Sequence, residues 1–479
     1  MAIPPHINHI HFVGIGGYGM SALALILLKK GYRVSGSDLN KSPLTDTLTA
    51  QGAQVSFGHN ADNIGAAELV IYSTAVNGDN PELIETDRLG LPLWHRSELL
   101  AALLNDSYGI AVAGAHGKTT TTAMLSLLLE AGGLDPTAII GGVLPAYGSN
   151  ARLGSSSYLV AEADESDSSF MRYYPRLALV TGIEPDHLEH YENDYARLQR
   201  AYANFLAHLP AEGTAVLNAE DSGLLALAAK LPCSIITYSS TAVTSGEKEE
   251  GEVDSFGSAA PTVDYHAANV CLKPDSSTFD LYHRGTLVAS TITLGVPGCH
   301  NISNATGALA AAAALGLNLN TCIPALAAFH GVGRRFELIG EASGITVIDD
   351  YAHHPTEVKA TLETARISGR RVICLFQPHR YSRTANLFEE FAAAFTGADH
   401  LFLHSIYSAG EAPLPGTSSA ALAGRIRKLS GVPVTQNDDI TLLETEAARL
   451  ARPGDMIITM GAGDITYSAP RILKLLRQK

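Results

Sequence analysis

A glycine- and threonine-rich segment, GAHGKTTTT at 114–122, has the composition of a phosphate-binding loop. It follows the apolar run GIAVAG and precedes a helical pattern, so that successive backbone N–H groups can cradle phosphate oxygens. In such a loop Lys118 neutralises the β and γ phosphates of ATP, and the Thr119 hydroxyl binds Mg²⁺. Val112 stands where the usual GxxxxGK[ST] pattern has its first glycine. The segment therefore predicts an ATP site of a shortened subclass.

A second glycine pattern lies near the start of the chain. Gly14, Gly16 and Gly19 spell GxGxxG between a predicted strand and a predicted helix, and Asp38 ends the next predicted strand. The pattern is typical of a dinucleotide fold. The glycines serve only to let the backbone approach a pyrophosphate at a helix N-terminus. A UDP-sugar, which also contains a pyrophosphate, therefore fits the pattern equally well.

A Mg·ATP site also needs a carboxylate, and the segment YLVAEADESD offers four. Glu162 comes at the end of the apolar strand, where side chains emerge at the carboxyl edge of a sheet, and we expect it to bind the metal. Asp164, Glu165 and Asp167 are interpreted as solvated surface. His187, in GIEPDHLEHY, is a second candidate ligand, although a loop histidine is more often structural.

Polar motifs also follow two predicted strands near the C-terminus. DDYAHHP at 349–355 follows one strand, and QPHRYSRT at 377–384 follows the next. Open α/β sheets bind ligands at the carboxyl ends of their strands, so these motifs predict a binding site. Asn301 and the arginines of GVGRRFE at 331–337 suit adenine and phosphate recognition.

Short apolar runs that alternate with helical patterns position these motifs. The alternation starts near residue 9, restarts after residue 107 and returns after residue 333. It predicts an α/β protein with domains at 1–107, 108–330 and 331–479, the first and third doubly wound and the central one mixed α/β. A Ser/Gly/Glu-rich stretch at about 239–262 is interpreted as a polar surface insert.

Composition excludes several classes of protein. The 479 residues carry a net charge of −15, and no long Lys/Arg run appears, so a nucleic-acid surface is not expected. The N-terminus lacks a signal-peptide pattern, and no apolar stretch is long enough for a membrane helix. Five widely spaced cysteines without a CxxC pair predict a reducing, cytoplasmic compartment.

Taken in order, these motifs resemble those of the Mur ligase family. GIGGYGMS, GAHGKTTTT, EADESDSSF, EPDHLEHY, HNISNATGA, GRRFE, DDYAHHPTE, QPHRYSRT and MGAGD span nearly the whole chain. The resemblance implies a Rossmann-like UDP-sugar domain, a central P-loop-type ATPase domain and a Rossmann-like amino-acid domain. It also implies a ligase that joins L-alanine to the carboxylate of UDP-N-acetylmuramate through an acyl phosphate in peptidoglycan precursor synthesis.

The resemblance assigns site residues by position in the motifs. The residues expected to bind ATP are Gly114, His116, Gly117, Lys118, Thr119, Thr120, Asn301, Arg335 and Asp350. Those expected to bind the UDP-sugar are Gly14, Gly16, Gly17, Gly19, Met20, Ser21, Asp38, Ser73 and His116. Those expected around the amino acid are Tyr351, His353, His354, Arg380 and Arg383. The expected metal ligands are Thr119, Glu162 and His187, and the expected catalytic set is Lys118, His187, Arg335, His353 and Arg380.

The family pattern has two departures here, Ala115 in place of Thr and Gly182 in place of Asn. No lysine occurs between His187 and Lys230, so the carbamoylated lysine of other Mur ligases is not expected. The implied cofactors are ATP and two Mg²⁺ ions, for which Mn²⁺ can substitute, and the expected state is a monomer or homodimer.

Three other functions fit part of the sequence. A murein-tripeptide-recycling ligase of the same family shares the DDxAHHP segment, but we expect it to lack the QPHRYSRT form. An NAD-dependent dehydrogenase explains the GxGxxG pattern but leaves the phosphate loop without a role. A non-catalytic nucleotide-binding regulator is disfavoured by the intact set of phosphate and metal residues.

Overall fold

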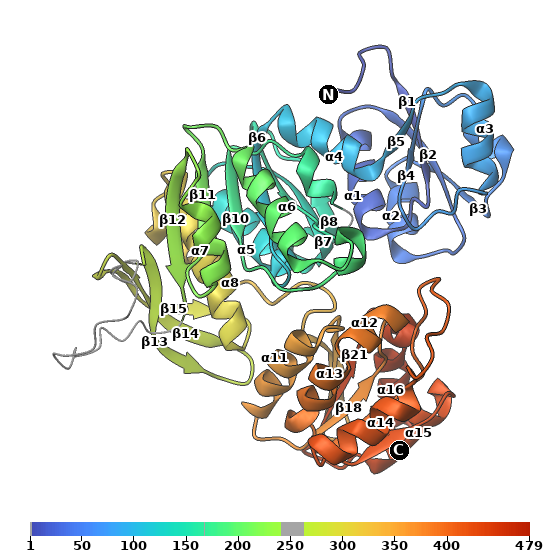
Figure 1. Ribbon diagram of the computed structural model, residues 1–479, viewed down its shortest axis with the longest axis vertical. Coiled ribbons are helices and arrows are strands. Elements are labelled where there is room, and N and C mark those ends of the chain that lie inside the picture. Colours follow the sequence, from blue (N-terminus) through green and yellow to red (C-terminus); the bar gives the residue numbers. More distant parts are fainter. Residues whose placement is uncertain (1, 167, 241–262) are drawn as a thin grey trace. The chain divides into compact units, whose positions relative to one another are not determined.

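The computed structural model describes residues 2–166, 168–240 and 263–479 (Figure 1). The chain forms two compact units. The first comprises Met1–Ala268, Asp280–Ile292 and Ser303–Phe329, and the second comprises Asn269–Phe279, Thr293–Ile302 and His330–Lys479. Residues 241–262 of the predicted polar insert lie outside the described residues.

The first sheet has five strands in the order β3-β2-β1-β4-β5, all paired in parallel. The central strand β1 is buried along its whole length, as expected for an apolar run covered on both faces. The strands are β1 (His9–Val13), β2 (Arg33–Asp38), β3 (Gln54–Phe57), β4 (Leu69–Tyr72) and β5 (Leu93–His95). The helices are α1 (Tyr18–Lys29), α2 (Pro43–Ala50), α3 (Pro81–Leu89) and α4 (Arg96–Asn105), with the 3₁₀ turn η1 (Ala61–Ile64).

One carboxylate is buried among the elements of the first sheet. It belongs to Glu82, at the start of α3, which is fully buried. Burial alone would raise its pKa, but hydrogen bonds from His11, Ser37 and Asn63 outweigh burial and lower the pKa to about 2. Glu82 is therefore ionised in the folded protein at neutral pH.

We expect Glu82 to make stability depend on acid pH. Because its pKa falls from 4.5 to about 2 on folding, its ionised form stabilises the fold above about pH 4.5, and this stabilisation is lost as the pH falls toward 2. The contribution at pH 7 is on the order of 3 kcal/mol. Urea unfolding of the wild type and Glu82→Gln should show a stability difference that shrinks between pH 6 and pH 3. A pH-independent difference would contradict this account.

The central sheet has ten strands in the order β15-β14-β13-β12-β11-β10-β6-β9-β7-β8. Its strands are β6 (Tyr108–Ala113), β7 (Thr137–Leu144), β8 (Ser149–Arg152), β9 (Tyr158–Glu162), β10 (Leu177–Val180), β11 (Thr214–Asn218), β12 (Ser234–Ser239), β13 (Tyr265–Leu272), β14 (Ser277–His283) and β15 (Thr286–Leu294). Its helices are α5 (Lys118–Ala131), α6 (Tyr195–Ala207), α7 (Ser222–Ala228), α8 (Cys299–Ala314), α9 (Leu319–Cys322) and α10 (Pro324–Ala327), and its 3₁₀ turns are η2 (Pro145–Tyr147), η3 (Ser169–Arg172) and η4 (Leu188–Tyr191).

The first and central sheets share one hydrophobic core. A single cluster of buried side chains runs from Ile7 in the first sheet region to Ala228 on α7. Helix α1 packs against both β7 and β8. Asn150 on β8 also donates its amide to Tyr18 O at 2.6 Å. These contacts place the two glycine-rich segments within one compact unit.

The third sheet has six strands in the order β16-β17-β21-β18-β19-β20, with β16 antiparallel to β17 and the other pairs parallel. The strands are β16 (Glu337–Ala342), β17 (Ile345–Asp350), β18 (Val372–Phe376), β19 (His400–Leu403), β20 (Val434–Gln436) and β21 (Met456–Met460). The helices are α11 (Pro355–Arg366), α12 (Tyr381–Asn386), α13 (Phe388–Ala394), α14 (Ser419–Leu429), α15 (Ile440–Leu450) and α16 (Ser468–Arg477), with the 3₁₀ turns η5 (Phe395–Gly397) and η6 (Asp464–Tyr467).

One helix differs from its prediction. The pattern TANLFEEFAAAF predicts one continuous helix, but the structure breaks it into α12 and α13 at Leu387. Leu387 has φ −116° and ψ 31°, outside the helical region. Across the described ranges, no helix combines the length and apolar character needed to cross a membrane.

Candidate active site

The phosphate loop connects β6 to α5 in a conformation that requires glycine. Gly114 and Gly117 have φ values of 130° and 81°. A Cβ added at Gly114 would lie 2.0 Å from Thr181 Oγ1, and one added at Gly117 would lie 2.4 Å from Asn304 Oδ1. Gly117 also begins α5 without a side-chain cap, which leaves the first N–H groups of the helix for a ligand.

Lys118 is held inside this loop by a buried carboxylate. Its Nζ donates to Gly114 O at 2.7 Å and to both oxygens of Glu165, at 2.9 and 2.8 Å. Glu165 is only 2% exposed. Burial alone would lower the pKa of Lys118, but the charges of Glu165, Asp164 and Glu162, together with the hydrogen bond to Glu165, outweigh burial and raise it. Lys118 is therefore a fixed cation at the loop, and Glu165 is not the solvated residue that the sequence suggested.

Thr119 and Glu162 lie together next to the loop. Thr119 Oγ1 donates to Glu162 Oε2 at 3.1 Å, and Gly141 N donates to Glu162 Oε1 at 2.5 Å. Strand β9 pairs with β6 so that Glu162 is opposite Val112 at the end of the strand. Neighbouring hydroxyl and carboxylate oxygens are the donors that Mg²⁺ prefers, so the pair fits a Mg²⁺ ion.

The turn after β10 supports the other side of the loop. Thr181 Oγ1 donates to His116 O at 2.5 Å, and His116 Nε2 lies 3.4 Å from Glu184 Oε2. His187 lies in the same turn, with φ 55° and its Nε2 3.5 Å from Asp186 Oδ2. This turn therefore places His187, Asp186 and Glu184 after the end of β10, the strand that pairs with β6.

The glycine turn after β1 is held by the end of β2. Gly14 N and Ile15 N both donate to Ser37 O, at 2.8 and 2.9 Å. Gly16 N donates to Asp38 Oδ2 at 2.8 Å, and a Cβ added at Gly16 would lie at the same distance from that oxygen. Asp38 thus shapes the turn itself, a role that the spacing of the GxGxxG pattern does not reveal.

Not every residue expected at the UDP-sugar faces the glycine turn. The side chains of Met20 and Ser21 on α1 are both 2% exposed. Ser21 Oγ accepts a hydrogen bond from Asn150 on β8 at 3.1 Å and donates to Tyr18 O. Ser21 is therefore directed toward the central sheet, whereas Ser73 follows the end of β4 and is half-buried.

The two C-terminal motifs meet at one edge of the third sheet. Strands β17 and β18 flank β21, and the motifs follow their carboxyl ends. Four rings form a continuous row: Tyr351 to His353 at 5.1 Å between centroids, His353 to His379 at 6.0 Å, and His379 to Tyr407 at 5.4 Å. The row joins segments that lie more than 50 residues apart in the sequence.

Arginines surround this row of rings. The guanidinium groups of Arg334 and Arg335 lie 5.0 and 5.2 Å from the Tyr351 ring centroid. Arg383 on α12 is 7% exposed, with Nη1 3.5 Å from His379 Nδ1. Arg380, which precedes α12 with φ 70°, donates its N–H to Tyr407 O at 2.8 Å. The edge is therefore rich in arginine, although Arg334 pairs with Asp349 at 2.8 Å and Arg335 lies 3.5 Å from Glu357. Guanidinium groups suit anionic ligands.

Asp350 is buried at the end of β17. Its Oδ1 accepts from Ala352 N at 2.7 Å, and its Oδ2 accepts from Phe336 N at 2.8 Å. Burial raises its pKa to about 6, although Arg335 opposes the increase. Both carboxylate oxygens of Asp350 therefore accept hydrogen bonds from the main chain, one from the DDYAHHP segment and the other from the GRRFE segment.

Two other expected ligand residues make structural hydrogen bonds. His354 Nδ1 accepts from Thr356 N at 3.4 Å and caps α11. Asn301 Nδ2 donates to Pro297 O at 2.7 Å near the start of α8. The side chains of both residues are almost fully buried.

Several residues of the predicted motifs have hydrogen-bond partners that the sequence does not indicate. Arg334 donates to Asp349 at 2.8 Å and to Gly461 O at 2.7 Å, which fixes the ends of β17 and β21. Gln377 donates to Asp464 at 2.6 Å. The MGAGD motif contains Asp464, but nothing local indicates a partner 87 residues away.

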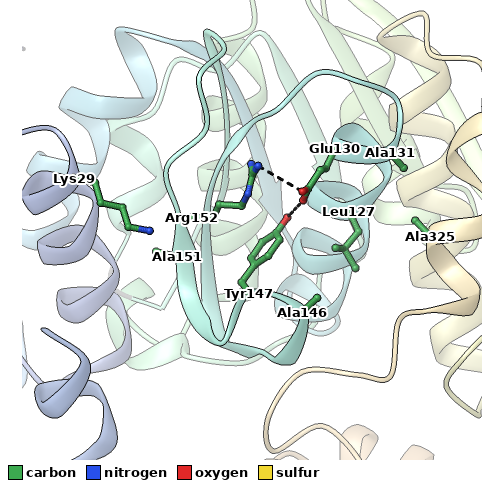
Figure 2. A pocket seen from close by; sticks show the side chains of 9 residues that line it. All are labelled: Lys29, Leu127, Glu130, Ala131, Ala146, Tyr147, Ala151, Arg152 and Ala325. Atoms are coloured by element: carbon green, nitrogen blue, oxygen red, sulfur yellow. Dashed lines mark hydrogen bonds and ion pairs between the residues drawn. The ribbon is translucent and has the colours of Figure 1, made fainter. Parts of the chain in front are cut away.

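A separate cavity of about 510 Å³ lies at the other end of α5 (Figure 2). Two of its charged residues are paired: Tyr147 donates to Glu130 at 3.1 Å, and Arg152 lies 3.5 Å from Glu130 and pairs with Asp135 (Figure 2 draws the first two contacts). Burial and the neighbouring Glu130 raise the pKa of Tyr147. This cavity lies away from the glycine-rich segments, and we assign no ligand to it.

Three family models match successive parts of the chain. Residues 9–108 match the Mur ligase family catalytic domain, 112–312 the Mur ligase middle domain, and 334–463 the Mur ligase glutamate ligase domain. Together these matches correspond to an α/β protein of three domains.

Relatives and solved structures cover almost the whole chain. Proteins named UDP-N-acetylmuramate–L-alanine ligase are 45% identical in Pelotomaculum thermopropionicum and 44% identical in Anaeromyxobacter dehalogenans, with 98% of both chains covered in each case. The crystal structure of UDP-N-acetylmuramate-alanine ligase from Thermotoga maritima has a TM-score of 0.80 at 28% identity, covering 98% of this chain and 99% of that one. A murein peptide ligase from Psychrobacter arcticus has a TM-score of 0.70 at 27% identity, with the same coverage.

Proposed function

Because the chain belongs to the Mur ligase family, we propose that it joins L-alanine to the muramate carboxylate of UDP-N-acetylmuramate in an ATP-dependent step of peptidoglycan precursor synthesis. The observation that carries this proposal is the full-length similarity, at 44–45% identity, to relatives of that name. We further propose domains at about 1–107, 108–330 and 331–479, with one binding site in each. The three matched ranges, 9–108, 112–312 and 334–463, support these bounds.

In the proposed reaction a carboxylate oxygen of the muramate attacks the γ-phosphorus of ATP, and ADP leaves. The amine of L-alanine then attacks the acyl carbon, an amide bond forms, and inorganic phosphate leaves. Lys118 binds the phosphates from within the loop, supported by its position above Gly114 O. Arg335 is proposed to stabilise the same developing charge, so that catalysis is mainly positioning and electrostatics.

We assign Thr119 and Glu162 to a Mg²⁺ ion, and His187 to a second one. The contact of 3.1 Å between Thr119 Oγ1 and Glu162 Oε2 supports the first assignment. When bound, the ions neutralise phosphate charge. The protein holds Thr119 Oγ1 and Glu162 Oε2 close together beside the end of β9, next to the phosphate loop.

Replacing Glu162 by glutamine should raise the Mg²⁺ concentration that gives half-maximal activity by roughly tenfold or more, because a charged hard ligand is lost. The matched control is Glu212→Gln, which changes an exposed carboxylate that pairs with Arg176 at 2.6 Å and should leave the Mg²⁺ dependence unchanged. Titration of activity with Mg²⁺ and direct Mn²⁺ binding by electron paramagnetic resonance check both variants. Equal Mg²⁺ dependence in the wild type and Glu162→Gln would reject this ligand assignment.

For the amino acid, we propose the arginine-rich edge of the third sheet. Tyr351, His353, Arg380 and Arg383 lie around one ring row there, and a guanidinium can bind the alanine carboxylate through two hydrogen bonds. His354 is assigned a weaker part, because its side chain caps α11.

The similarity to a murein peptide ligase makes a tripeptide the second candidate nucleophile. Phosphate release from ATP is measured with UDP-N-acetylmuramate and, in turn, L-alanine, L-serine, glycine or an L-alanine-containing tripeptide, and each product is weighed by mass spectrometry. The proposal expects release that depends on both UDP-N-acetylmuramate and L-alanine, with an alanyl adduct. Turnover with the tripeptide alone would instead support the recycling activity.

A further inference from the structure

The glycine turn of the first sheet is built on one residue of β2. Ser37 is fully buried, and its carbonyl oxygen accepts from Gly14 N and Ile15 N at 2.8 and 2.9 Å. The next residue, Asp38, accepts from Gly16 N. The positions of three consecutive N–H groups in the turn therefore depend on how the end of β2 is held.

The hydroxyl of Ser37 is fixed by a buried carboxylate. Ser37 Oγ donates to Glu82 Oε2 at 2.6 Å, and the same oxygen lies 3.2 Å from His11 Nε2. Ser37 Oγ also lies 3.0 Å from His59 Nδ1. His11 is 1% exposed and Glu82 is fully buried, so this pair is removed from water.

The second oxygen of Glu82 holds the loop after β3. Glu82 Oε1 accepts from Asn63 Nδ2 at 2.6 Å and from Asn60 N at 3.2 Å, and it lies 3.5 Å from His59 Nδ1. One carboxylate thus connects β1, β2, the η1 segment and α3, all in the blue part of Figure 1. A buried charge with this many donors keeps its position because leaving any donor unpaired is costly.

We propose that Glu82 is a positioning residue for the UDP-sugar: it acts through Ser37 to keep the glycine turn in its binding conformation. The inference rests on the proposed function, in which this turn binds the pyrophosphate. Glutamine has nearly the same shape as glutamate. Its NH₂ group, however, cannot accept the hydrogen bonds that the replaced carboxylate oxygen accepts, so the surrounding donors lose a partner. The end of β2 then relaxes, and the turn loses its alignment with the pyrophosphate oxygens.

The test compares Glu82→Gln with a matched buried carboxylate outside the first sheet. Glu444 on α15 is 2% exposed and accepts from Ser468 Oγ at 2.7 Å and from Arg471 Nη1 at 3.3 Å. For both variants, KM is measured separately for UDP-N-acetylmuramate, ATP and L-alanine, together with kcat and Tm. Glu82→Gln should raise KM for UDP-N-acetylmuramate by about tenfold and leave the other two KM values within about twofold.

A third variant, Ser37→Ala, tests whether the effect passes through the serine. It should raise the same KM, and the double variant with Glu82→Gln should be no worse than Glu82→Gln alone, because both changes interrupt one chain of contacts. Should Glu82→Gln fail to fold, Ser37→Ala still gives the selective KM change or its absence.

Two results would overturn the inference. The first is an unchanged KM for UDP-N-acetylmuramate, and the second is an equal rise in all three KM values, which indicates a folding role only. Glu444→Gln should lower Tm without a selective KM change. Failure of the proposed function looks different, because the wild type itself would then show no turnover with UDP-N-acetylmuramate, and the inference would fall with it.

Discussion

Lys118→Ala is expected to lower kcat by about 10³-fold while the protein remains folded. Lys118 is the only side chain of the loop that carries a fixed positive charge, and its Nζ lies 2.7 Å from Gly114 O, inside the proposed phosphate cradle. Without it, the charge that develops on the transferred phosphoryl group loses one of the cations that stabilise it. Steady-state ligation and circular dichroism measure activity and folding on the same preparation.

Lys118→Ala also leaves Glu165 buried without its counter-ion. A control must therefore separate the loss of the lysine charge in catalysis from a loss of protein stability. In Lys118→Ala/Glu165→Gln the uncompensated charge is gone, so we expect Tm to recover while ligation stays low. Lys230→Ala, at an exposed position of the same domain, should behave as the wild type. Near-normal turnover by Lys118→Ala would overturn the assignment of the phosphate loop.

Gly114→Ala is expected to lower kcat/KM for ATP on the order of 100-fold, because the loop must move to accept a side chain. At φ 130° the new Cβ would lie 2.0 Å from Thr181 Oγ1 and 2.9 Å from Thr181 N. Rotating the threonine relieves only the first contact, since the second is with backbone. We also expect the free energy of unfolding to fall by about 1–3 kcal/mol.

Gly133→Ala is the matched control for this substitution. Gly133 follows the other end of α5 with φ 85°, and a Cβ there would meet no atom within 4 Å. Gly133→Ala should lower the free energy of unfolding by about 1–2 kcal/mol through backbone strain alone and leave ATP turnover unchanged. If Gly114→Ala kept the wild-type KM for ATP, the loop would not be the phosphate cradle.

The sequence predicts features that depend on nearby residues. The phosphate loop, the GxGxxG turn and the buried strands all follow from local spacing and apolar runs, and the strands β17, β18, β19 and β21 confirm that part of the interpretation. The end of β9 likewise places Glu162 beside Thr119, as the position of the carboxylate after an apolar run suggests.

Features that depend on distant partners could not be predicted. Glu165 looks like one of several surface acids until it is seen to pair with Lys118, 47 residues away. Glu82 and His11 are 71 residues apart, and neither belongs to a recognised motif. Asp38 has the position expected of a ligand-binding acid, yet its Oδ2 supports Gly16. The burial of Glu165 and Glu82 and the contact of Asp38 with the turn decide these roles, and both are properties of the fold.

The most direct test of the account follows the oxygen of the muramate carboxylate. UDP-N-acetylmuramate labelled with ¹⁸O in that carboxylate is turned over with ATP and L-alanine, and the released phosphate and the product are weighed by mass spectrometry. We expect one ¹⁸O atom in the phosphate and an alanyl adduct that has lost one label, because the carboxylate oxygen leaves with phosphorus when the amide forms. Phosphate without label, or phosphate release without an alanyl adduct, would contradict it.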